Sequence, residues 1–446
     1  MLPQRRVVLS AAMAVFLLVA GNAPAAGVKA VTSSSTASAL PYPTPAPAIS
    51  GTAPTTVFSV GTEIVAYTRT ADDGVVRSLP TKIYYPATAA GAGTPVADGR
   101  FPLILFSHGL DGTYDTYPGP ISKLVQAGFI VAAPEYPHSK KGSVTNFDDA
   151  YKGRQSLDAS QVITNVLARD TAAGDKFFGH VNAAAGVGAA GHSLGGVTTS
   201  GLLGLKRDTR ITGAVLYAPQ GIGIPTGPAV KVLFQHGDGD TVLTYASGRS
   251  AYNAIPSSWP KAFLTHLGGG HWQYLWPNGP NYTQTWMTSV DWFRWSLYND
   301  WAAYSRLSAD ALGSGGTKWE TVNLVNIQVE AEKYVVMSGV KNEVVVGGEL
   351  VGAIDTNDWM VYVVNVPVAG TYTVQYRVAS PNAGGVIQFQ KRRAGEVYGT
   401  VNVPQTGGWQ TWTTVSHQVT LPAGSQRLGI KAAVGGFNID WFRITQ

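Results

Sequence analysis

The stretch Gly191-His192-Ser193-Leu194-Gly195 has the form G-x-S-x-G. Residues 186–190 before it are small and apolar, and residues 196–203 after it can wind as a helix. A strand, a sharp turn and a helix in this order lift a serine hydroxyl above a sheet, where a base and a substrate can both reach it. The stretch predicts an α/β fold with Ser193 as a nucleophile. Because the chain has 52 glycines, this prediction needs support from an acid and a base further along the chain.

Two apolar segments downstream, 231–237 and 261–267, are predicted strands, and each is followed by a loop that contains glycine. The first loop carries two acidic candidates, Asp238 and Asp240, and the second carries His271. Open parallel sheets place their sites at the carboxyl ends of strands. We therefore expect the histidine to take the proton of the serine, and an aspartate to orient the imidazole. The order serine, aspartate, histidine differs from the orders in two common protease folds.

An acyl-transfer intermediate needs two backbone N–H groups around its oxyanion. The residue after the nucleophile, Leu194, supplies one of them in such a turn. The other comes from a loop after an early strand, and residues 101–106 form such a strand ahead of Ser107-His108-Gly109-Leu110. Since Gly109 lets the backbone turn sharply, the N–H of Leu110 is the second predicted donor.

Residues from about 55 to 300 resemble an α/β-hydrolase of the dienelactone hydrolase, chlorophyllase and platelet-activating-factor acetylhydrolase group, which is also similar to bacterial polyester hydrolases. The resemblance implies a mainly parallel sheet with helices on both faces, and it assigns the acid to Asp240. The motifs that carry it are Phe106-Ser107-His108-Gly109, Gly191-His192-Ser193-Leu194-Gly195-Gly196, Gly237-Asp238-Gly239-Asp240 and Gly270-His271.

The chain departs from the polyester hydrolases in three ways. Leu194 stands where those enzymes usually carry methionine, the loop 218–223 lacks their substrate-clamping tryptophan, and the chain has no cysteine for their disulfide. These differences argue against activity on aromatic polyesters.

The ends and composition of the chain predict export. Residues 1–25 have the basic start, the apolar run and the small-residue cleavage site of a signal peptide. Residues 26–54, rich in Ser, Thr, Ala and Pro, are a predicted linker. The chain has a formal charge of +5 and no basic cluster, which argues against nucleic-acid binding. We expect a secreted monomer that does not span a membrane.

The 446 residues are too many for one ordinary domain. Strand and helix patterns alternate over 55–305, which is the predicted catalytic domain, and 306–324 is a second predicted linker. Within the catalytic domain, Arg154 and Asp158 have the spacing of an ion pair on one helix.

The walls of the predicted site come from aromatic residues after the histidine. Trp272 and Tyr274 are candidates for a wall of the acyl or sugar pocket, or else for the packed core. Lipases often carry a long insertion after the strand at 213–217, but here only residues 220–230 precede the next strand. We therefore expect an open cleft.

From residue 325 the pattern changes to short alternating segments. Tyr372, Val374, Tyr376 and Val378 fall on one face of a strand, which is typical of an all-β sandwich over 325–446.

This segment resembles a family 6 carbohydrate-binding module along its whole length, which implies a jelly-roll sandwich. The residues that carry the resemblance are Glu330-Ala331-Glu332, Asn357-Asp358-Trp359, 366–372, 406–412, 421–424 and 437–442. By this resemblance Trp409 is the platform that stacks on a sugar, Asn438 contacts its hydroxyls, and the second aromatic of the family is replaced by Ala353.

The same resemblance implies a structural calcium ion. Its ligands would be Glu330, Glu332 and Asp440, whose hard oxygen atoms suit calcium. Catalysis itself needs no cofactor in this scheme.

Together these features predict a secreted serine carboxylic ester hydrolase that releases acetyl or feruloyl groups from plant-cell-wall polysaccharide and is held there by its module. One alternative is a polyester or polyhydroxyalkanoate depolymerase, or a broad lipase or esterase. Another is a carbohydrate-binding protein with a relict hydrolase domain, against which the complete Ser-Asp-His set argues.

Overall fold

The computed structural model describes residues 52–313, 315–345 and 348–446. The predicted signal peptide at 1–25 and most of the linker at 26–54 therefore lie outside the described residues. Among the described helices, none combines the length and the apolar composition that crossing a bilayer requires.

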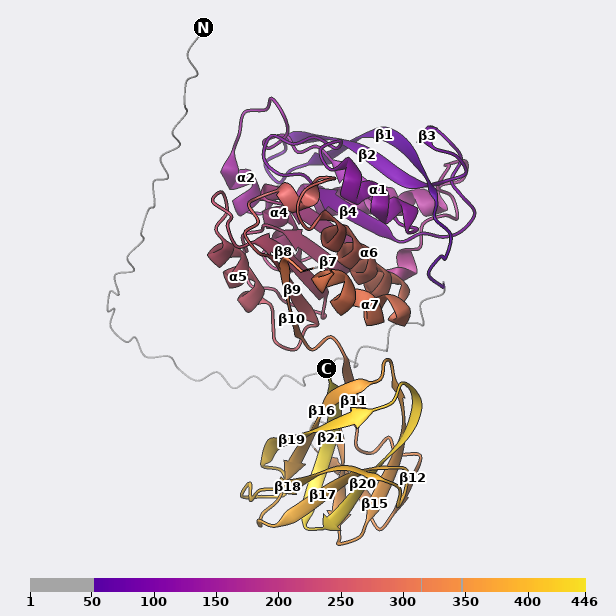
Figure 1. The fold of residues 1–446 in the computed structure, drawn as a ribbon, viewed down its shortest axis with the longest axis vertical. Coiled ribbons are helices and arrows are strands. Elements are labelled where there is room, and N and C mark those ends of the chain that lie inside the picture. Colours follow the sequence, from indigo (N-terminus) through magenta and orange to yellow (C-terminus); the bar gives the residue numbers. More distant parts are fainter. Residues whose placement is uncertain (1–51, 314, 346–347) are drawn as a thin grey trace, which may run out of the picture. The chain divides into compact units, whose positions relative to one another are not determined.

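The first domain is built on a ten-stranded sheet (Figure 1). Its central strands, from β5 through β9, are parallel, and its flanks are antiparallel apart from the short β3. In spatial order the strands are β10 (Thr317–Val322), β9 (Lys261–His266), β8 (Lys231–Gly237), β7 (Ile211–Tyr217), β6 (Val187–His192), β4 (Leu103–Ser107), β5 (Ile130–Pro134), β2 (Val76–Ala87), β1 (Ser59–Thr70) and β3 (Gly91–Ala92).

Both faces of the sheet are covered because alternate residues of each strand are apolar. In β4, Leu103 and Leu105 belong to one core cluster, and Ile104 and Phe106 belong to the other. On the first face lie α3 (Arg154–Ala168), α4 (Leu194–Leu203) and α5 (Tyr245–Ala254), with α2 (Phe147–Tyr151) beside α4; on the second lie α1 (Pro118–Gln126), α6 (Tyr282–Tyr298) and α7 (Trp301–Leu312). Short 3-10 helices span Arg169–Thr171, Ala183–Ala185 and Gln273–Leu275. The predicted α/β-hydrolase architecture is confirmed.

No helix lies in the segment 220–230 between β7 and β8. The long lipase insertion is therefore missing from this point of the fold, as the sequence predicts.

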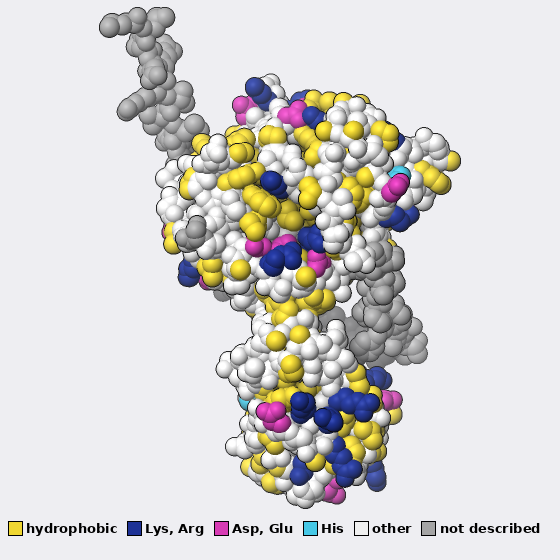
Figure 2. Space-filling view, turned by 45° about the vertical axis from the view of Figure 1, so that its right-hand side comes forward, with side chains coloured by type: hydrophobic (Ala, Val, Ile, Leu, Met, Phe, Trp, Pro, Cys, Tyr) yellow, Lys and Arg dark blue, Asp and Glu magenta, His cyan; other side chains and the backbone are white. Residues whose placement is uncertain are grey.

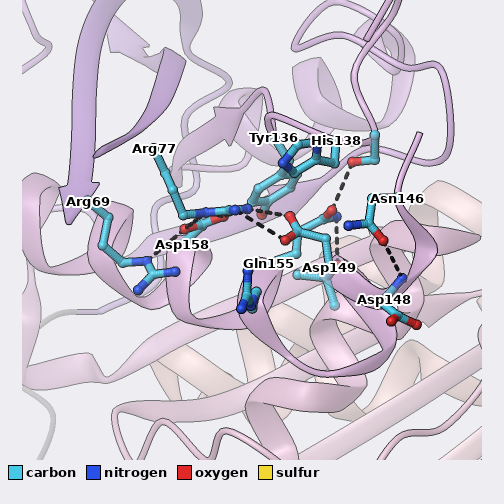
Figure 3. Close-up of polar contacts among 12 residues, drawn as sticks. Arg69, Arg77, Tyr136, His138, Asn146, Asp148, Asp149, Gln155 and Asp158 are labelled. Atoms are coloured by element: carbon cyan, nitrogen blue, oxygen red, sulfur yellow. Dashed lines mark hydrogen bonds and ion pairs between the residues drawn. The ribbon is translucent and has the colours of Figure 1, made fainter. Parts of the chain in front are cut away.

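A buried ion network joins the first strands to α2 and α3 (Figure 3). Arg77 on β2 contacts both Asp149 and Asp158, and Arg69 Nε donates to Asp158 Oδ1 at 2.7 Å. Burial works against the charge of Arg77, but the hydrogen bonds and the charges of the two aspartates together outweigh burial and raise its pKa. Removing one partner would leave an uncompensated buried charge.

The predicted pair of Arg154 and Asp158 is wrong. Asp158 faces the interior and is fully buried, so it pairs with the strand arginines, whereas Arg154 faces outward and lies 3.5 Å from Asp73. Helical spacing alone did not show that one residue faces the sheet.

The predicted linker at 306–324 is also wrong. It contains the end of α7 and the whole of β10, which pairs antiparallel with β9 from Thr317↔His266 to Val322↔Lys261. The glycines at 313–316 suggested a break, but the segment after them adds an edge strand whose Trp319 packs on the core.

The second domain is an antiparallel β-sandwich, which confirms the predicted fold class. One sheet contains β13 (Lys341–Val345), β14 (Gly348–Ile354), β21 (Phe437–Thr445), β16 (Gly370–Ala379) and β19 (Trp412–Leu421), with β11 (Asn326–Glu330) paired to β21. The other contains β12 (Val336–Ser338), β15 (Trp359–Val366), β20 (Gly424–Val434), β17 (Gly385–Lys391) and β18 (Val397–Val403). The alternating residues Tyr372, Val374, Tyr376 and Val378 are all fully buried between the sheets.

Candidate active site

Ser193 lies in a strained turn between β6 and α4. Its φ of 56° lies in the left-handed region, which is costly for a residue with a side chain. The flanking glycines allow the turn to close: a Cβ on Gly191 would lie 2.2 Å from Gly195 O, and one on Gly195 would lie 2.0 Å from Ser107 O. The spacing of the motif is thus a steric requirement.

The structure brings Ser193, His271 and Asp240 into one line of hydrogen bonds. His271 Nε2 lies 2.8 Å from Ser193 Oγ, and His271 Nδ1 lies 2.6 Å from Asp240 Oδ2. Asp240 is 6% exposed, as is His271, whereas Ser193 remains partly accessible. The alternative acid, Asp238, is exposed and accepts a hydrogen bond from the N–H of Gly268 instead.

The carboxylate of Asp240 is held from several sides. Its Oδ1 accepts from the N–H groups of Val242 and Leu243, and its Oδ2 also lies 3.0 Å from Nε2 of His236. Since that nitrogen also lies 2.9 Å from the carbonyl of Leu243, it must carry a hydrogen. Burial alone would raise the pKa of Asp240, but the hydrogen bonds from His236 and His271 lower it. The aspartate therefore stays ionised.

The peptide between Gly109 and Leu110 is oriented by His108. Nδ1 of His108 donates to the carbonyl of Gly109 at 2.7 Å, and the N–H of Gly112 donates to the same oxygen at 3.1 Å. Burial lowers the pKa of His108 to about 4, so the ring stays neutral and keeps this tautomer. In a trans peptide the N–H points away from its carbonyl, so the N–H of Leu110 is held on the opposite side.

Tyr117 connects this loop to the serine turn. Its hydroxyl accepts from the N–H of Gly109 at 3.2 Å and lies 2.8 Å from Nδ1 of His192. His192 Nε2 in turn lies 2.8 Å from the carbonyl of His271, to which it must donate. Burial, together with the neighbouring His271, lowers the pKa of His192 to about 3, so Nδ1 is free to accept from the tyrosine. Three segments distant in sequence, at residues 109–117, 192 and 271, are thus joined by one chain of hydrogen bonds.

Both predicted oxyanion donors lie beside Ser193. Leu194 is the first residue of α4, where the positive end of the helix dipole favours a negative charge. Neither the N–H of Leu194 nor that of Leu110 donates to another residue within the described ranges. Both groups therefore remain available to a ligand.

A cavity of about 380 Å³ opens over the serine. Its wall is mostly apolar, and its polar groups are near the serine and histidine. The lining residues are Gly109, Leu110, Thr116, Tyr117, His192, Ser193, Val242, His271, Trp272 and Trp276.

Of the two aromatic residues predicted for the wall, only Trp272 lies there. It is 49% exposed, whereas Tyr274 is 1% exposed and stacks on His266 with ring centroids 4.0 Å apart. The prediction for Tyr274 is wrong because the short helix at Gln273–Leu275 turns its ring into the core. Trp276, which the sequence did not single out, lines the cavity in its place and stacks on Tyr117 at 6.2 Å.

Two further residues were missed by sequence reasoning. Tyr117 belongs to no sequence motif. Its role depends on the packing of α1 beside the serine turn, which the sequence does not show. His236 precedes Asp240 by four residues at the end of β8, and that position at a strand end was the available signal.

In the sandwich, Trp409 and Asn438 are neighbours with different exposure. Trp409 is 51% exposed, as a stacking platform requires, but Asn438 is 3% exposed and its Nδ2 donates to the carbonyl of Trp409 at 3.0 Å. The amide of Asn438 therefore supports the loop that carries Trp409, and its contact with sugar stays a prediction. Ala353, where an aromatic was expected, has a φ of 48°.

The three predicted calcium ligands are only partly suited to a cation. Glu332 Oε2 is buried without a hydrogen-bond partner, but Glu330 Oε1 accepts from Gln328, and Asp440 Oδ2 pairs with Arg377 at 2.8 Å. Over the described ranges no group of three acidic or histidine side chains is arranged to hold a metal. The calcium site stays a prediction that rests on Glu332.

Two family models match parts of the chain. Residues 54–156 match platelet-activating factor acetylhydrolase, isoform II, and residues 330–446 match carbohydrate binding module (family 6). The first match includes the loop of His108 and Leu110 but ends before Ser193. The chain is thus similar to an esterase-type hydrolase family over residues 54–156 and to a carbohydrate-binding module over residues 330–446.

Individual relatives are similar over short segments. The chain is 39% identical to the clotting factor G alpha subunit of Tachypleus tridentatus over 26% of its own length and 18% of the relative's. It is 33% identical to beta-agarase AgaA of Microbulbifer thermotolerans over 19% of its own length and 20% of the relative's. The chain therefore spans about a fifth of these curated relatives.

Among solved structures, a carbohydrate binding module of Cellvibrio mixtus lichenase 5A, in complex with cellotriose, is 45% identical with a TM-score of 0.26. The match covers 27% of this chain and 96% of that one.

Proposed function

We propose that the protein is an extracellular serine ester hydrolase that releases acyl groups, acetyl or feruloyl, from plant-cell-wall polysaccharide. The observation that carries this proposal is the line from Ser193 Oγ through His271 to Asp240, with spacings of 2.8 and 2.6 Å. Export, catalysis and glycan binding are the three parts of the proposal.

In the first half of the reaction, His271 Nε2 takes the proton of Ser193 as the oxygen attacks the ester carbonyl. The C=O becomes a tetrahedral oxyanion, which the N–H groups of Leu110 and Leu194 stabilise. His271 then gives its proton to the departing sugar oxygen, and the C–O bond breaks to leave an acyl-serine. Asp240 holds the imidazole tautomer and stabilises the imidazolium throughout.

In the second half, water takes the place of the sugar alcohol. His271 removes a proton from the water as it attacks the acyl-serine, and then returns a proton to Ser193 as the free acid leaves. The hydrogen bonds of His108 and Tyr117 hold the oxyanion loop in place, so little reorganisation is needed when charge develops.

The cavity wall favours an apolar acyl group. Leu110, Val242, Trp272 and Trp276 line it and carry no charge. A feruloyl ring, which is flat and weakly polar, is better matched to such a wall than a charged acyl group. The same exposed aromatic surface supports polyester hydrolysis as the second candidate function.

The C-terminal module supports the placement on polysaccharide. Its match to a carbohydrate-binding family and the exposed ring of Trp409 favour a glycan ligand. A tether raises the local concentration of enzyme at the polymer without changing the chemical step. An agarase among the similar proteins favours action outside the cell.

A substrate panel tests the proposal. Feruloylated arabinoxylan, acetylated xylan, long-chain esters and a polyester film are offered to the full chain and to Ser193→Ala. We expect release of ferulate or acetate by the wild type and none by the variant. Activity on the film alone would support the second candidate, and equal release by Ser193→Ala would contradict the mechanism.

A further inference from the structure

A second buried histidine, His236, contacts the same carboxylate oxygen as His271. It is the last residue but one of β8, is fully buried and precedes Asp240 by four residues. A tight turn, in which the N–H of Asp240 donates to the carbonyl of Gly237 at 3.3 Å, returns the aspartate to the end of the strand. His236 Nε2 then lies 3.0 Å from Asp240 Oδ2, and His271 Nδ1 lies 2.6 Å from the same atom. Two imidazoles therefore share one carboxylate oxygen.

The neighbours of His236 fix its tautomer. Its Nε2 lies 3.0 Å from Asp240 Oδ2 and 2.9 Å from the carbonyl of Leu243, and both of these atoms are acceptors. Its Nδ1 is buried and has no hydrogen-bond partner among the described residues. The N–H of the ring is thus divided between the aspartate and the loop whose N–H groups hold the other carboxylate oxygen.

Helix α5 holds the ring of His236 in this position. A Cβ on Gly248 would lie 2.1 Å from Nδ1 of His236, so the helix can pack this closely only because that residue has no side chain. Tyr245 of the same helix meets the imidazole edge to face, with ring centroids 5.9 Å apart, and its hydroxyl bonds Oγ1 of Thr265. The direction of the Nε2–H bond is therefore set by packing and does not depend on a substrate.

The other titratable groups around the two imidazoles do not replace the charge of Asp240. Burial lowers the pKa of His192, at the end of β6, and of His266, at the end of β9, to about 3. Burial also raises the pKa of Tyr274. Figure 2 shows histidine only in small spots on the visible surface, in agreement with the burial of these rings. The carboxylate of Asp238 is exposed and bonds a backbone N–H instead.

We infer that His236 is a positioning residue that shares the charge of Asp240 with His271 and so sets the pH range in which His271 accepts the serine proton. A donor bonded to a carboxylate favours its ionised form and makes the carboxylate a weaker base. Asp240 therefore stabilises the imidazolium of His271 less than it would without His236. The inference rests on the proposed ester hydrolysis, in which His271 must be unprotonated to act as the base.

The test is the pH profile of kcat/KM for a nitrophenyl ester, measured on the full chain. His236→Leu removes the donor, whereas His236→Gln keeps an N–H group at a similar reach from the backbone. His266→Leu is the matched control, because it removes another fully buried histidine, whose Nε2 bonds Gln235 rather than Asp240. Thermal unfolding, and recovery of activity on return to pH 7, show whether each variant is folded over the pH range.

We expect the acid limb of His236→Leu to lie at least about 0.5 pH unit above that of the wild type, because the freed carboxylate holds the imidazolium more strongly. On the plateau, kcat should fall by less than about 10-fold, the effect of one lost hydrogen bond, and KM should change little. His236→Gln should restore the wild-type limb, and His266→Leu should leave it in place. An unmoved limb in His236→Leu would overturn the inference, as would an equal shift in His236→Gln or in His266→Leu.

Gly248→Ala tests the same contact without removing the histidine. The added methyl group would lie 2.1 Å from Nδ1 of His236 and so displaces the ring, although alanine is the better helix former. The acid limb should move in the same direction as in His236→Leu, by a smaller amount. Where His236→Leu does not fold, an unmoved limb in Gly248→Ala would overturn the inference.

A measurement without turnover separates this inference from the proposed function. Proton NMR of the free enzyme observes the Nδ1–H of His271 in its bond to Asp240. Its resonance should move downfield in His236→Leu, because the bond to a more basic carboxylate is stronger, and should stay in place in His236→Gln. An unchanged resonance in His236→Leu would overturn the inference at any level of activity. Failure of the wild type to hydrolyse any ester would instead contradict only the proposed function.

Discussion

The site around Ser193 and the predicted sugar-binding surface around Trp409 are built in opposite ways. Around the serine, His108, His192 and Asp240 are buried and hydrogen-bonded, and their geometry is set before any substrate arrives. Around Trp409 the ring is exposed, and the neighbouring amide is used to hold the loop. Bond-making chemistry needs groups held in advance, whereas glycan binding can use separate exposed contacts.

The largest expected effect comes from replacing the acid in the line of hydrogen bonds from Ser193 through His271 to Asp240. Asp240→Asn should lower kcat by about 10⁴-fold, because an amide favours the wrong imidazole tautomer. Steady-state kinetics on a nitrophenyl ester measures it. Asp238→Asn is the matched control and should change kcat by less than about 2-fold. If Asp238→Asn lowered kcat strongly and Asp240→Asn did not, Asp238 would be the acid.

Lowering the pH should destabilise the hydrolase domain more than the sandwich. Burial lowers the pKa of His108, His192 and His266 to about 4, about 3 and about 3, below their unfolded values near 6.5. The unfolded chain therefore binds more protons than the folded one between those limits. Stability is complete above about pH 6.5 and is lost as the pH falls toward 3, by about 2 kcal/mol per histidine between pH 7 and 5.

The sandwich has a single histidine, His417, with a pKa lowered by partial burial. Calorimetry of the full chain should show the hydrolase transition moving to lower temperature before the sandwich transition does. Equal shifts of both transitions would contradict the assignment of the buried neutral histidines.

Tyr117→Phe tests the connection between the oxyanion loop and the serine turn. It leaves Nδ1 of His192 and the N–H of Gly109 without their shared partner, at a cost of about 1–2 kcal/mol, or roughly 5- to 30-fold in kcat. KM for a short ester should change little, since the ring remains. Tyr151→Phe, whose hydroxyl bonds Gln220 outside the cavity, is the control. A rise in KM alone would show that Tyr117 only contacts substrate.

Trp409→Ala should weaken binding of neutral xylan by roughly 10-fold, the loss of one aromatic platform. Esterase activity on a soluble ester should stay unchanged. Val344→Ala, another exposed apolar residue of the sandwich, serves as the control, and binding is measured by affinity gel electrophoresis. Unaltered xylan binding by Trp409→Ala would show that the sugar site lies elsewhere.

The smallest effect concerns calcium. If Glu332 binds the ion, chelation should lower the midpoint of the sandwich transition by roughly 2–5 °C, because a ligand that binds only the folded state stabilises it. Glu332→Gln should remove this response, and Glu349→Gln, an exposed residue, should keep it. A response to chelation in both variants would exclude Glu332 as the ligand.

The sequence was enough to predict the α/β sheet, the sandwich, and the places of Ser193 and His271, and these follow from short-range rules. The choice of Asp240 over Asp238 came from the family resemblance. Glycine spacing is set by the steric closure of the turn, and the ends of parallel strands share one edge of the sheet. Local alternation likewise revealed the sandwich core at Tyr372 and Val374.

The tertiary structure decided what each side chain faces. Tyr274 turned into the core while Trp276 took its place, Asp158 paired with Arg77 rather than with Arg154, and β10 joined the sheet where a linker was expected. These outcomes depend on packing between segments far apart in sequence. Periodicity along one segment contains no information on such partners, because burial and charge pairing are properties of the assembled core.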